Sequence, residues 1–313
     1  MLGKTAGGVF WMLRYMERTE NTARMIDAGL RISLTRSSAA ESEWTSILTA
    51  SGLLAGYKAR HDTIDAQKVI NFLLRDKSNP GSVMSAVEEA RTNARVVRTA
   101  LTREVWEAVN ECWLVLKDLL SKQVKQQDLP EILGTIRQRS AYVRGSLHGT
   151  MVRNDIYDFA RMGTFFERAD NAARILDVKY YILLPSIMHV GSVSDNVQWE
   201  TILRATSSTR AYQTLHENEF DPRKIAQFLI LDRRLPRSLS FCYRKISDNL
   251  GYLASDYGER MPSHRMVDQI CQRFDTTSID QIFDYGLHEF VTEFLADSQA
   301  LGRQIEIDYR FYE

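Results

Sequence analysis

Two stretches of the chain repeat the same polar residues, of types that could bind an ion or exchange a proton. The stretches are YMERTENTARMID, residues 15–27, and FFERADNAARILD, residues 165–177. The polar positions that are identical between the two copies are Glu17 and Glu167, Arg18 and Arg168, Asn21 and Asn171, Arg24 and Arg174, and Asp27 and Asp177. The apolar positions vary between the copies, as core positions that tolerate exchanges of similar volume do. Identity at the polar positions indicates that these side chains need a specific geometry.

Each copy reads as one face of a helix. Steps of four and seven residues nearly complete whole helical turns, so Glu17, Asn21 and Arg24 share a narrow face. The opposite face is apolar in both copies, and in the first copy it consists of Met12, Tyr15, Met16, Ile26 and Leu30. The pattern predicts two core helices that each carry one polar face.

The favoured interpretation of these faces is structural. Glu17 would pair with Arg24 or, across the repeat, with Arg174, and Glu167 would pair with Arg24. Planar guanidinium groups suit such bidentate pairing. Buried pairs of this kind fix register more than they stabilise a fold.

A second interpretation places the two faces around a cleft. The arginines would hold a carboxylate or phosphate there, and the glutamates would hold an amine or act as acid and base. A third, metal ligation by Glu17, Glu20, Glu167 and Asp170, has less support, because arginines lie nearby and no Glu-x-x-His occurs. We predict no metal site and no cofactor.

The repeat extends well beyond the motif. EWTSIL at 43–48 matches QWETIL at 198–203, and FLLRDKSNPGS at 72–82 matches FLILDRRLPRS at 228–238. The offset between the copies drifts only from 150 to 156 residues, which favours two homologous halves, approximately 1–125 and 150–275, packed about a pseudo-two-fold axis. No Ser- or Gly-rich linker separates them, so we expect a single helical domain over 1–313.

Apolar residues recur at helical spacing along nearly the whole chain, which predicts an all-α bundle of about ten to twelve helices. Five prolines, at 80, 130, 222, 236 and 262, stand where helices should start. Thr277 to Asp280 has the form of a capping box and predicts a long C-terminal helix over 277–310.

Composition limits the class of function. The chain has 40 basic and 40 acidic residues and no net charge, so it lacks the basic footprint that nucleic acids or anionic membranes require. Three distant cysteines fit a reducing compartment better than a disulfide framework. No leader-like segment or long apolar run is evident, and we expect a cytoplasmic location.

The motif pair YMERTENTAR and FFERADNAAR, with ARTNARVVR at 90–98 and VWEAVNE at 105–111, resembles the bacterial alpha-E family. The resemblance covers almost the whole chain. It implies an all-helical protein whose genes tend to accompany those of a circularly permuted ATP-grasp protein, transglutaminase-like peptidases and a proteasome-like hydrolase. This association of genes suggests a system for ATP-driven amide-bond formation or peptide modification. The residues that carry over are the eight at 17, 18, 21, 24, 167, 168, 171 and 174.

These observations leave three hypotheses. The chain is a helical partner that positions the substrate of an ATP-grasp ligase without catalysis of its own, an enzyme with a twin Glu-Arg cleft, or an interaction scaffold only. The sequence contains no recognisable nucleophile motif, metal cluster or phosphate loop, which favours the first.

Overall fold

The computed structural model describes residues 3–35, 40–183, 193–216 and 220–312, and these residues form helices without a β-strand. The all-α prediction is confirmed. The described residues contain fifteen α-helices, compared with the ten to twelve expected, because short helices of five to eight residues stand between the long ones.

The first half of the chain forms seven α-helices. They are α1 (Gly3–Thr35), α2 (Ala40–Ala50), α3 (Leu54–Lys58), α4 (Ala66–Leu74), α5 (Val83–Val96), α6 (Arg103–Leu119) and α7 (Leu129–Thr150), with short 3-10 turns at Arg98–Ala100 and Gln126–Asp128. The second half forms eight, which are α8 (Asp155–Leu183), α9 (Val193–Ala205), α10 (Thr209–His216), α11 (Pro222–Ile230), α12 (Leu239–Tyr257), α13 (Pro262–Thr276), α14 (Ile279–Tyr285) and α15 (Leu287–Asp308).

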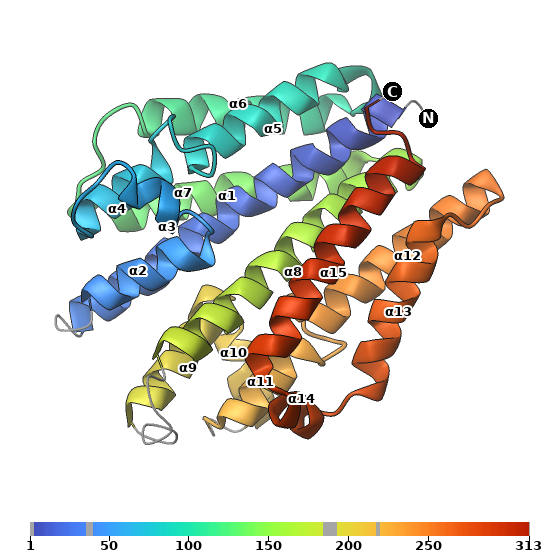
Figure 1. Ribbon diagram of the computed structural model, residues 1–313. Coiled ribbons are helices and arrows are strands. Elements are labelled where there is room, and N and C mark those ends of the chain that lie inside the picture. The colour runs from blue at the N-terminus through green and yellow to red at the C-terminus, as the bar shows by residue number, and fades with distance from the viewer. Residues whose placement is uncertain (1–2, 36–39, 184–192, 217–219, 313) are drawn as a thin grey trace.

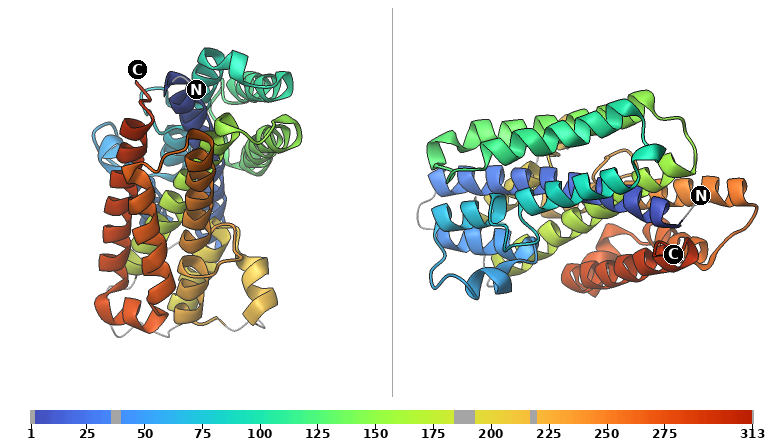
Figure 2. Two further views of the ribbon diagram at one scale, coloured as in Figure 1. Left: turned by 90° about the vertical axis from the view of Figure 1, so that its right-hand side faces the viewer. Right: turned by 90° about the horizontal axis from the view of Figure 1, so that it is seen from above.

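The two motif helices, α1 and α8, lie side by side at the centre of the molecule (Figure 1). Helix α1 also packs against α5 and α7 of its own half, and α8 packs against α12 and α15 of its own half. Seen from above in Figure 2, α6 and α7 lie along one side of the molecule and α15 along the other. Each motif helix therefore packs against the other motif helix and against two long helices that follow it in the chain.

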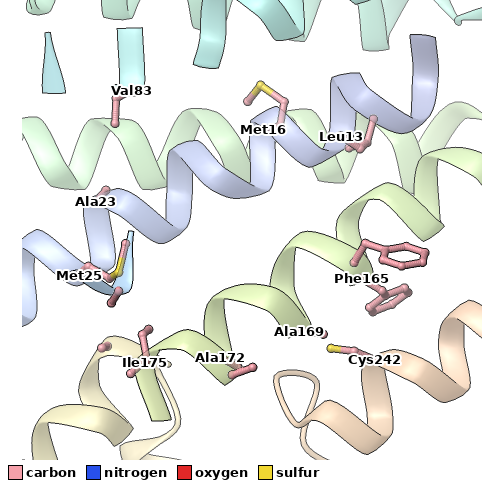
Figure 3. Close-up of a cluster of buried hydrophobic side chains, with 14 of the residues drawn as sticks. Leu13, Met16, Ala23, Met25, Val83, Phe165, Ala169, Ala172, Ile175 and Cys242 are labelled. Atoms are coloured by element: carbon pink, nitrogen blue, oxygen red, sulfur yellow. The ribbon is translucent and has the colours of Figure 1, made fainter. Parts of the chain in front are cut away.

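Apolar side chains fill the contacts of the central pair with their neighbours (Figure 3). Leu13 and Met16 on α1 and Phe165 and Ala169 on α8 are all at most 2% exposed. At Gly163 the two helices come so close that an added Cβ would lie 2.1 Å from the carbonyl oxygen of Phe10. Backbone contact of this kind requires glycine.

The prediction of one long C-terminal helix was wrong. The capping box is present, with Ser278 at the N-cap and Gln281 bonded back to it. The helix ends at Tyr285, however, because Gly286 takes a φ of 115°, which reverses the backbone before α15 begins. The final segment is thus two helices at an angle.

The prolines largely mark helix starts, as predicted. Pro130, Pro222 and Pro262 occupy the first turns of α7, α11 and α13. Pro80 and Pro236 instead lie two residues before Ser82 and Ser238, the serines that cap α5 and α12. The sequence also predicts breaks between helices near residues 35–42, 185–195 and 218–222, and these lie partly outside the described residues.

Two further findings bear on the class of protein. None of the described helices combines the length and the apolar character needed to cross a lipid bilayer. Cys112 and Cys242 are buried thiols, and Cys271 is half-buried. Burial raises the pKa of the Cys242 thiol to about 12, which makes it unreactive near neutral pH.

Candidate functional site

The Glu-Arg motifs of the two central helices pair with each other. The guanidinium of Arg18 on α1 donates to the carboxylate of Glu167 on α8, with Nε–Oε1 and Nη2–Oε2 distances of 2.6 and 2.9 Å. In return, Arg168 on α8 donates to Glu17 on α1 at 2.8 and 3.0 Å. Each motif glutamate is therefore held in a bidentate ion pair by the motif arginine of the other half.

This pairing corrects the partners expected from the sequence. Arg24 bonds to Glu20 within α1, with its Nε 2.9 Å from Oε1, and Arg174 bonds to Asp170 within α8 at 2.8 Å. A spacing of four residues places these pairs on adjacent turns of one helix, which satisfies both arginines locally. The ion pairs across the repeat are thus made by Arg18 and Arg168, and not by Arg24 and Arg174 as expected.

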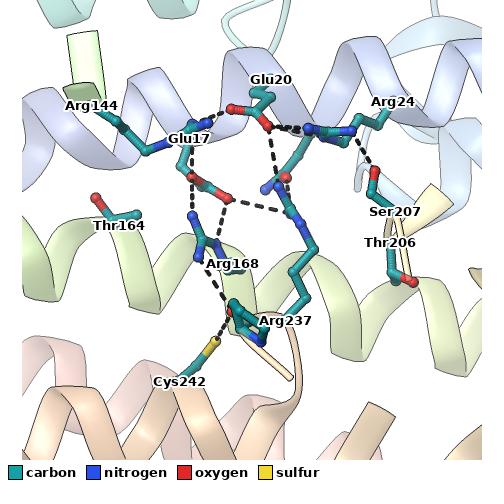
Figure 4. Close-up of polar contacts among 12 residues, drawn as sticks. Glu17, Glu20, Arg24, Arg144, Thr164, Arg168, Thr206, Ser207, Arg237 and Cys242 are labelled. Carbon is teal, nitrogen blue, oxygen red and sulfur yellow. Dashed lines mark hydrogen bonds and ion pairs between the residues drawn. The ribbon is translucent and has the colours of Figure 1, made fainter. Parts of the chain in front are cut away.

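The Glu17–Arg168 pair is enclosed by further arginines, and we call it the filled pair (Figure 4). Arg237, from the segment between α11 and α12, places its Nη1 3.4 Å from Glu17 Oε1 and its Nη2 3.2 Å from Glu20 Oε1. Arg144 of α7 approaches both glutamates from the other side. The carboxylates of Glu17 and Glu20 are thus paired with arginine side chains of the protein itself.

Charge compensation governs the protonation of the filled pair. Burial by itself would raise the pKa of Glu17, but the charges of Arg168, Arg237 and Arg144 hold it well below its usual range. Burial lowers the pKa of Arg237 to about 10, an effect that Glu17 opposes and the neighbouring Arg168 reinforces. The carboxylate therefore stays ionised throughout the physiological pH range.

The Glu167–Arg18 pair, which we call the open pair, faces a cleft of about 790 Å³. The cleft lies between the two motif helices and the segments that precede α3 and α5, and it is lined by Tyr15, Asn21, Ser51, Gly81, Asp170 and Asn171 among others. Its cationic lining residues are Arg18, Lys77 and Arg174, and its anionic ones are Glu88, Glu89, Glu167 and Asp170. The structure thus has a cleft beside the open pair, lined by residues of both motif helices.

The open pair is ionised as well. Burial would raise the pKa of Glu167, but Arg18 and Arg14 lower it through their charges and hydrogen bonds. Arg14 donates to Glu167 Oε2 at 3.1 Å, and its guanidinium also lies 4.7 Å from the centre of the Trp11 ring. The side chain of Arg18 is 31% exposed, so its outer edge is open to the cleft.

The two motif asparagines differ in their bonding. Asn21 is 2% exposed, and its Oδ1 accepts from Arg237 at 3.0 Å, whereas its buried Nδ2 has no hydrogen-bond partner. Within the described residues, the Asn171 side chain makes no hydrogen bond to the protein. A buried amide group without a partner at the edge of a polar cleft, such as the Asn21 Nδ2, indicates a place where a ligand could bond.

The four carboxylates considered as metal ligands each lie against arginine. Glu17 and Glu167 are in the bidentate pairs, Glu20 bonds to Arg24, and Asp170 bonds to Arg174. Among the described residues, no group of three or more His, Cys, Asp and Glu side chains is arranged to hold a metal ion.

The sequence analysis did not identify Arg14, Arg144 and Arg237. Their guanidinium groups lie against the motif glutamates in addition to those of Arg18 and Arg168. These arginines have no arginine at the matching position of the other half, so the repeat gave no signal for them. Glu20 and Asp170 were visible as matched acidic positions. Their role as anchors for Arg24 and Arg174 could have been inferred from the four-residue spacing.

Fold and site together define an all-helical protein built on two central helices that exchange Glu-Arg pairs. Residues 1–309 match the model of Alpha-E, described as a predicted alpha-helical domain with a conserved ER motif, and the chain belongs to this family. The reciprocal pairs involve the Glu-Arg dipeptides at residues 17–18 and 167–168.

Curated relatives are longer than this chain. Uncharacterised proteins of Mycobacterium bovis and of Mycobacterium tuberculosis are each 24% identical over 325 aligned residues. These matches cover 95% of this chain and 35% of each relative, so the chain spans about a third of the length of the relatives it matches. No solved structure matches the chain.

Proposed function

We propose that this protein is the substrate-positioning partner of an ATP-grasp ligase in a system that forms amide bonds, and that it performs no catalysis on its own. The open cleft would hold an amino acid or peptide while the partner supplies the ATP-dependent step. The observation that carries the proposal is the open pair, where a motif shared with the filled pair faces a cleft instead of further arginines.

The lining of the cleft suits a ligand that carries both charges. Arg18 and the unsatisfied Nδ2 of Asn21 can donate to a carboxylate. Glu88 and Glu89 lie on the α5 side of the same cleft and can accept from an amine. Separated donors and acceptors are what an amino acid or the end of a peptide requires.

The protonation state of the open pair favours binding over catalysis. Glu167 has a lowered pKa, and both of its carboxylate oxygens already accept from arginines. Such a carboxylate is a weak base, and it holds no proton to donate near neutral pH. The pair would therefore orient a ligand and leave proton transfer to the partner.

The length of the relatives supports a partner. In the mycobacterial proteins, a domain similar to this chain is part of a polypeptide about three times as long. Covalent connection raises the effective concentration of two parts that act together. The ATP-grasp identity of the partner rests on the family resemblance, as does a transglutaminase-like peptidase as a further partner. We propose further that the chain is a single bacterial, cytoplasmic domain whose two halves are related by a pseudo-two-fold axis.

The partnership is tested by recovery of tagged protein from its native cell, with crosslinking and mass spectrometry. Recovery of an ATP-grasp protein is expected, and its absence after crosslinking would contradict the proposal. Purified protein incubated with ATP and amino acids should show no turnover. Turnover by this chain alone would support the alternative of an enzyme.

The scaffold alternative has one observation in its favour, the reciprocal ion pairs, which would stabilise the fold without any ligand. It predicts a cleft that binds nothing. The ligand experiments below therefore also distinguish a scaffold from a substrate-positioning protein.

A further inference from the structure

The filled pair contains a guanidinium that belongs to a loop and not to the motif helices. Arg237 donates from Nη1 to Asn21 Oδ1 at 3.0 Å and from Nη2 to Glu20 Oε1 at 3.2 Å, and Nη1 lies 3.4 Å from Glu17. Its side chain is 12% exposed. One guanidinium thus contacts acceptor atoms of three motif-helix residues, Glu17, Glu20 and Asn21.

The corresponding position in the other half is a glycine. FLLRDKSNPGS at 72–82 aligns with FLILDRRLPRS at 228–238, which matches Gly81 with Arg237 between a proline and the serine that caps the next helix. Gly81 lines the open cleft. Gly81 therefore stands beside the cleft, at the position from which Arg237 extends in the other half.

The acceptors that Arg237 uses have counterparts in the cleft. Glu167, Asp170 and Asn171 correspond to Glu17, Glu20 and Asn21, and all three line the cleft. Asn171 makes no hydrogen bond to the described residues, whereas Asn21 accepts from Arg237. The open half thus presents the same three acceptor residues, with Glu167 paired to Arg18 and Arg14 and Asp170 paired to Arg174, but it has no counterpart of Arg237.

A second loop shows the same difference. EWTSIL at 43–48 and QWETIL at 198–203 are 155 residues apart, and the same offset matches Gly52 with Ser207. Both residues take a positive φ, 72° and 54°. Their amides bond to equivalent carbonyls, of Thr49 and Arg204, so the two turns share one backbone form. Ser207 Oγ accepts from Arg24 in the filled half, whereas Gly52 lines the open cleft.

The charge around the cleft also favours a cation. Glu88 and Glu89 line it, and the matching positions of α12 are Arg244 and Lys245. Lys77 lies 3.6 Å from Glu88, while Glu89 has no cationic partner among the described residues. Of the seven charged lining residues, four are anionic, so the cleft has a charge of −1 before a ligand binds.

We infer that the open cleft binds a guanidino group, carried by an amino acid or by a residue of a peptide, in the place that Arg237 fills in the other half. Asp170, Asn171 and Glu167 accept from it. The volume of about 790 Å³ exceeds that of a guanidinium alone and leaves space for the body of the ligand. This inference rests on the proposed function, because it names the chemical class of the substrate that the cleft would position.

The test measures binding of L-arginine, agmatine and an arginine-containing dipeptide to the purified full chain by calorimetry. L-citrulline, which has nearly the same shape but no charge, is the matched control ligand, and L-lysine tests a simple ammonium. We expect at least one guanidino ligand to bind about tenfold or more tightly than its uncharged or ammonium counterpart, as hydrogen bonds between charged groups allow.

A variant that copies the filled half provides the structural test. An added Cβ at Gly81 would lie 2.8 Å from a methyl group of Leu53, whose counterpart is Ser208, so Gly81→Arg is combined with Leu53→Ser. The double variant should lose guanidino binding because its own arginine occupies the cleft. Leu53→Ser alone, which changes the lining of the cleft but adds no guanidinium, is the reference against which that loss is measured. Asp170→Asn removes one acceptor with little change of shape and should weaken binding about tenfold. This variant tests the inference if the double variant does not fold.

Three results would overturn the inference. They are the absence of binding by all three guanidino ligands at millimolar concentration, equal binding of citrulline or lysine, and unchanged binding by a folded Gly81→Arg, Leu53→Ser variant. Recovery of the ATP-grasp partner with no guanidino binding would refute the inference alone. Guanidino binding without a partner would refute the partnership alone.

Discussion

The two motif glutamates occupy similar positions and have different surroundings. Glu17 is surrounded by Arg168, Arg144 and Arg237, and Glu167 by Arg18 and Arg14 with a cleft beside them. A motif that is identical in sequence thus serves in one half as part of a buried network and in the other as the wall of a cavity. The difference comes from residues outside the motif.

Replacing Glu17 with Gln should destabilise the protein strongly. The change leaves Arg168 without its carboxylate partner and leaves Arg144 and Arg237 with Glu20 alone. Breaking a buried pair in this way costs about 3 kcal/mol. For a chain of this length, we expect the melting temperature to fall by about 5 °C. The matched control is Glu107→Gln, which removes an exposed pair with Arg103 and should leave the melting temperature nearly unchanged.

An unchanged or raised melting temperature for Glu17→Gln would contradict a structural role for the filled pair. The same change at Glu167 should cost less, because water in the cleft can solvate the outer edge of Arg18.

Asp158 provides a pH-dependent test. It is 1% exposed, its Oδ1 has no hydrogen-bond partner, and burial raises its pKa to about 6, against a smaller lowering effect of Arg153. The folded state therefore holds a proton more tightly than the unfolded state, and this residue lowers stability as the pH rises through the window from about 4 to 6. Asp158→Asn should raise the melting temperature by a few degrees at pH 8 and have little effect at pH 4.

Thermal unfolding of both proteins at the two pH values checks this expectation. A difference between variant and parent that is the same at pH 4 and pH 8 would show that Asp158 titrates as an ordinary carboxyl group.

At the scale of the helices, caps and prolines gave the starts of elements reliably. Pro130, Pro222 and Pro262 lie in the first turns of helices, and Ser278 caps α14. Such signals are local, because they depend on the first four amides of a helix. The end of α14 was missed because Gly286 stands within an otherwise continuous helical pattern.

The partners of the motif arginines were predicted incorrectly for a different reason. Assigning residues to helix faces at 100° per residue treats one helix at a time. It grouped Glu17 with Arg24 because seven residues complete nearly two turns. Arg18, one residue after Glu17, points about 100° away and reaches the neighbouring helix. Which residues meet there depends on how α1 and α8 cross, and a crossing angle leaves no periodic trace in either sequence.

The close approach of α1 and α8 can be tested at Gly163. Gly163→Ala would place a Cβ 2.1 Å from the Phe10 carbonyl oxygen, so the helices must separate, at a cost of about 1–3 kcal/mol. Gly145→Ala in α7 is the control, because nothing lies within 4 Å of its added Cβ and alanine favours a helix by about 0.5–1 kcal/mol.

Denaturant titration of both variants measures the two effects. We expect opposite signs. A neutral Gly163→Ala would show that the helix pair can shift without loss, in which case the geometry of the ion pairs is less fixed than the contact indicates.

At the scale of the whole molecule, the sequence indicated the internal repeat, and the structure packs α1 and α8 against each other at its centre. The cleft beside the Glu167–Arg18 pair could not be predicted from the motif, because it depends on loop positions such as Gly81 whose proximity to the motif comes from the fold. A comparison of the two halves at those loops would have been the available signal.

The crossed pairs predict that neither half is stable alone. A fragment of residues 1–152 would leave Glu17 without Arg168 and Arg237, and it would expose the apolar face of α1 that packs on α8. We expect each fragment, 1–152 and 153–313, to lack a cooperative thermal transition by circular dichroism. The two fragments expressed together should associate and recover one transition.

A cooperative transition in either fragment by itself would contradict this expectation. It would mean that the contacts within a half suffice for folding and that the ion pairs serve only to join two complete units.

The distance along the chain between Arg18 and Glu167 has a consequence during synthesis. The two residues are 149 positions apart. A ribosome adding about 5–20 residues per second therefore needs roughly 7–30 s between them. Over that interval the nascent chain carries α1 with its central charges unmatched and its apolar face uncovered. The speed of translation, and not the speed of helix formation, sets how long this half of the protein is exposed to aggregation.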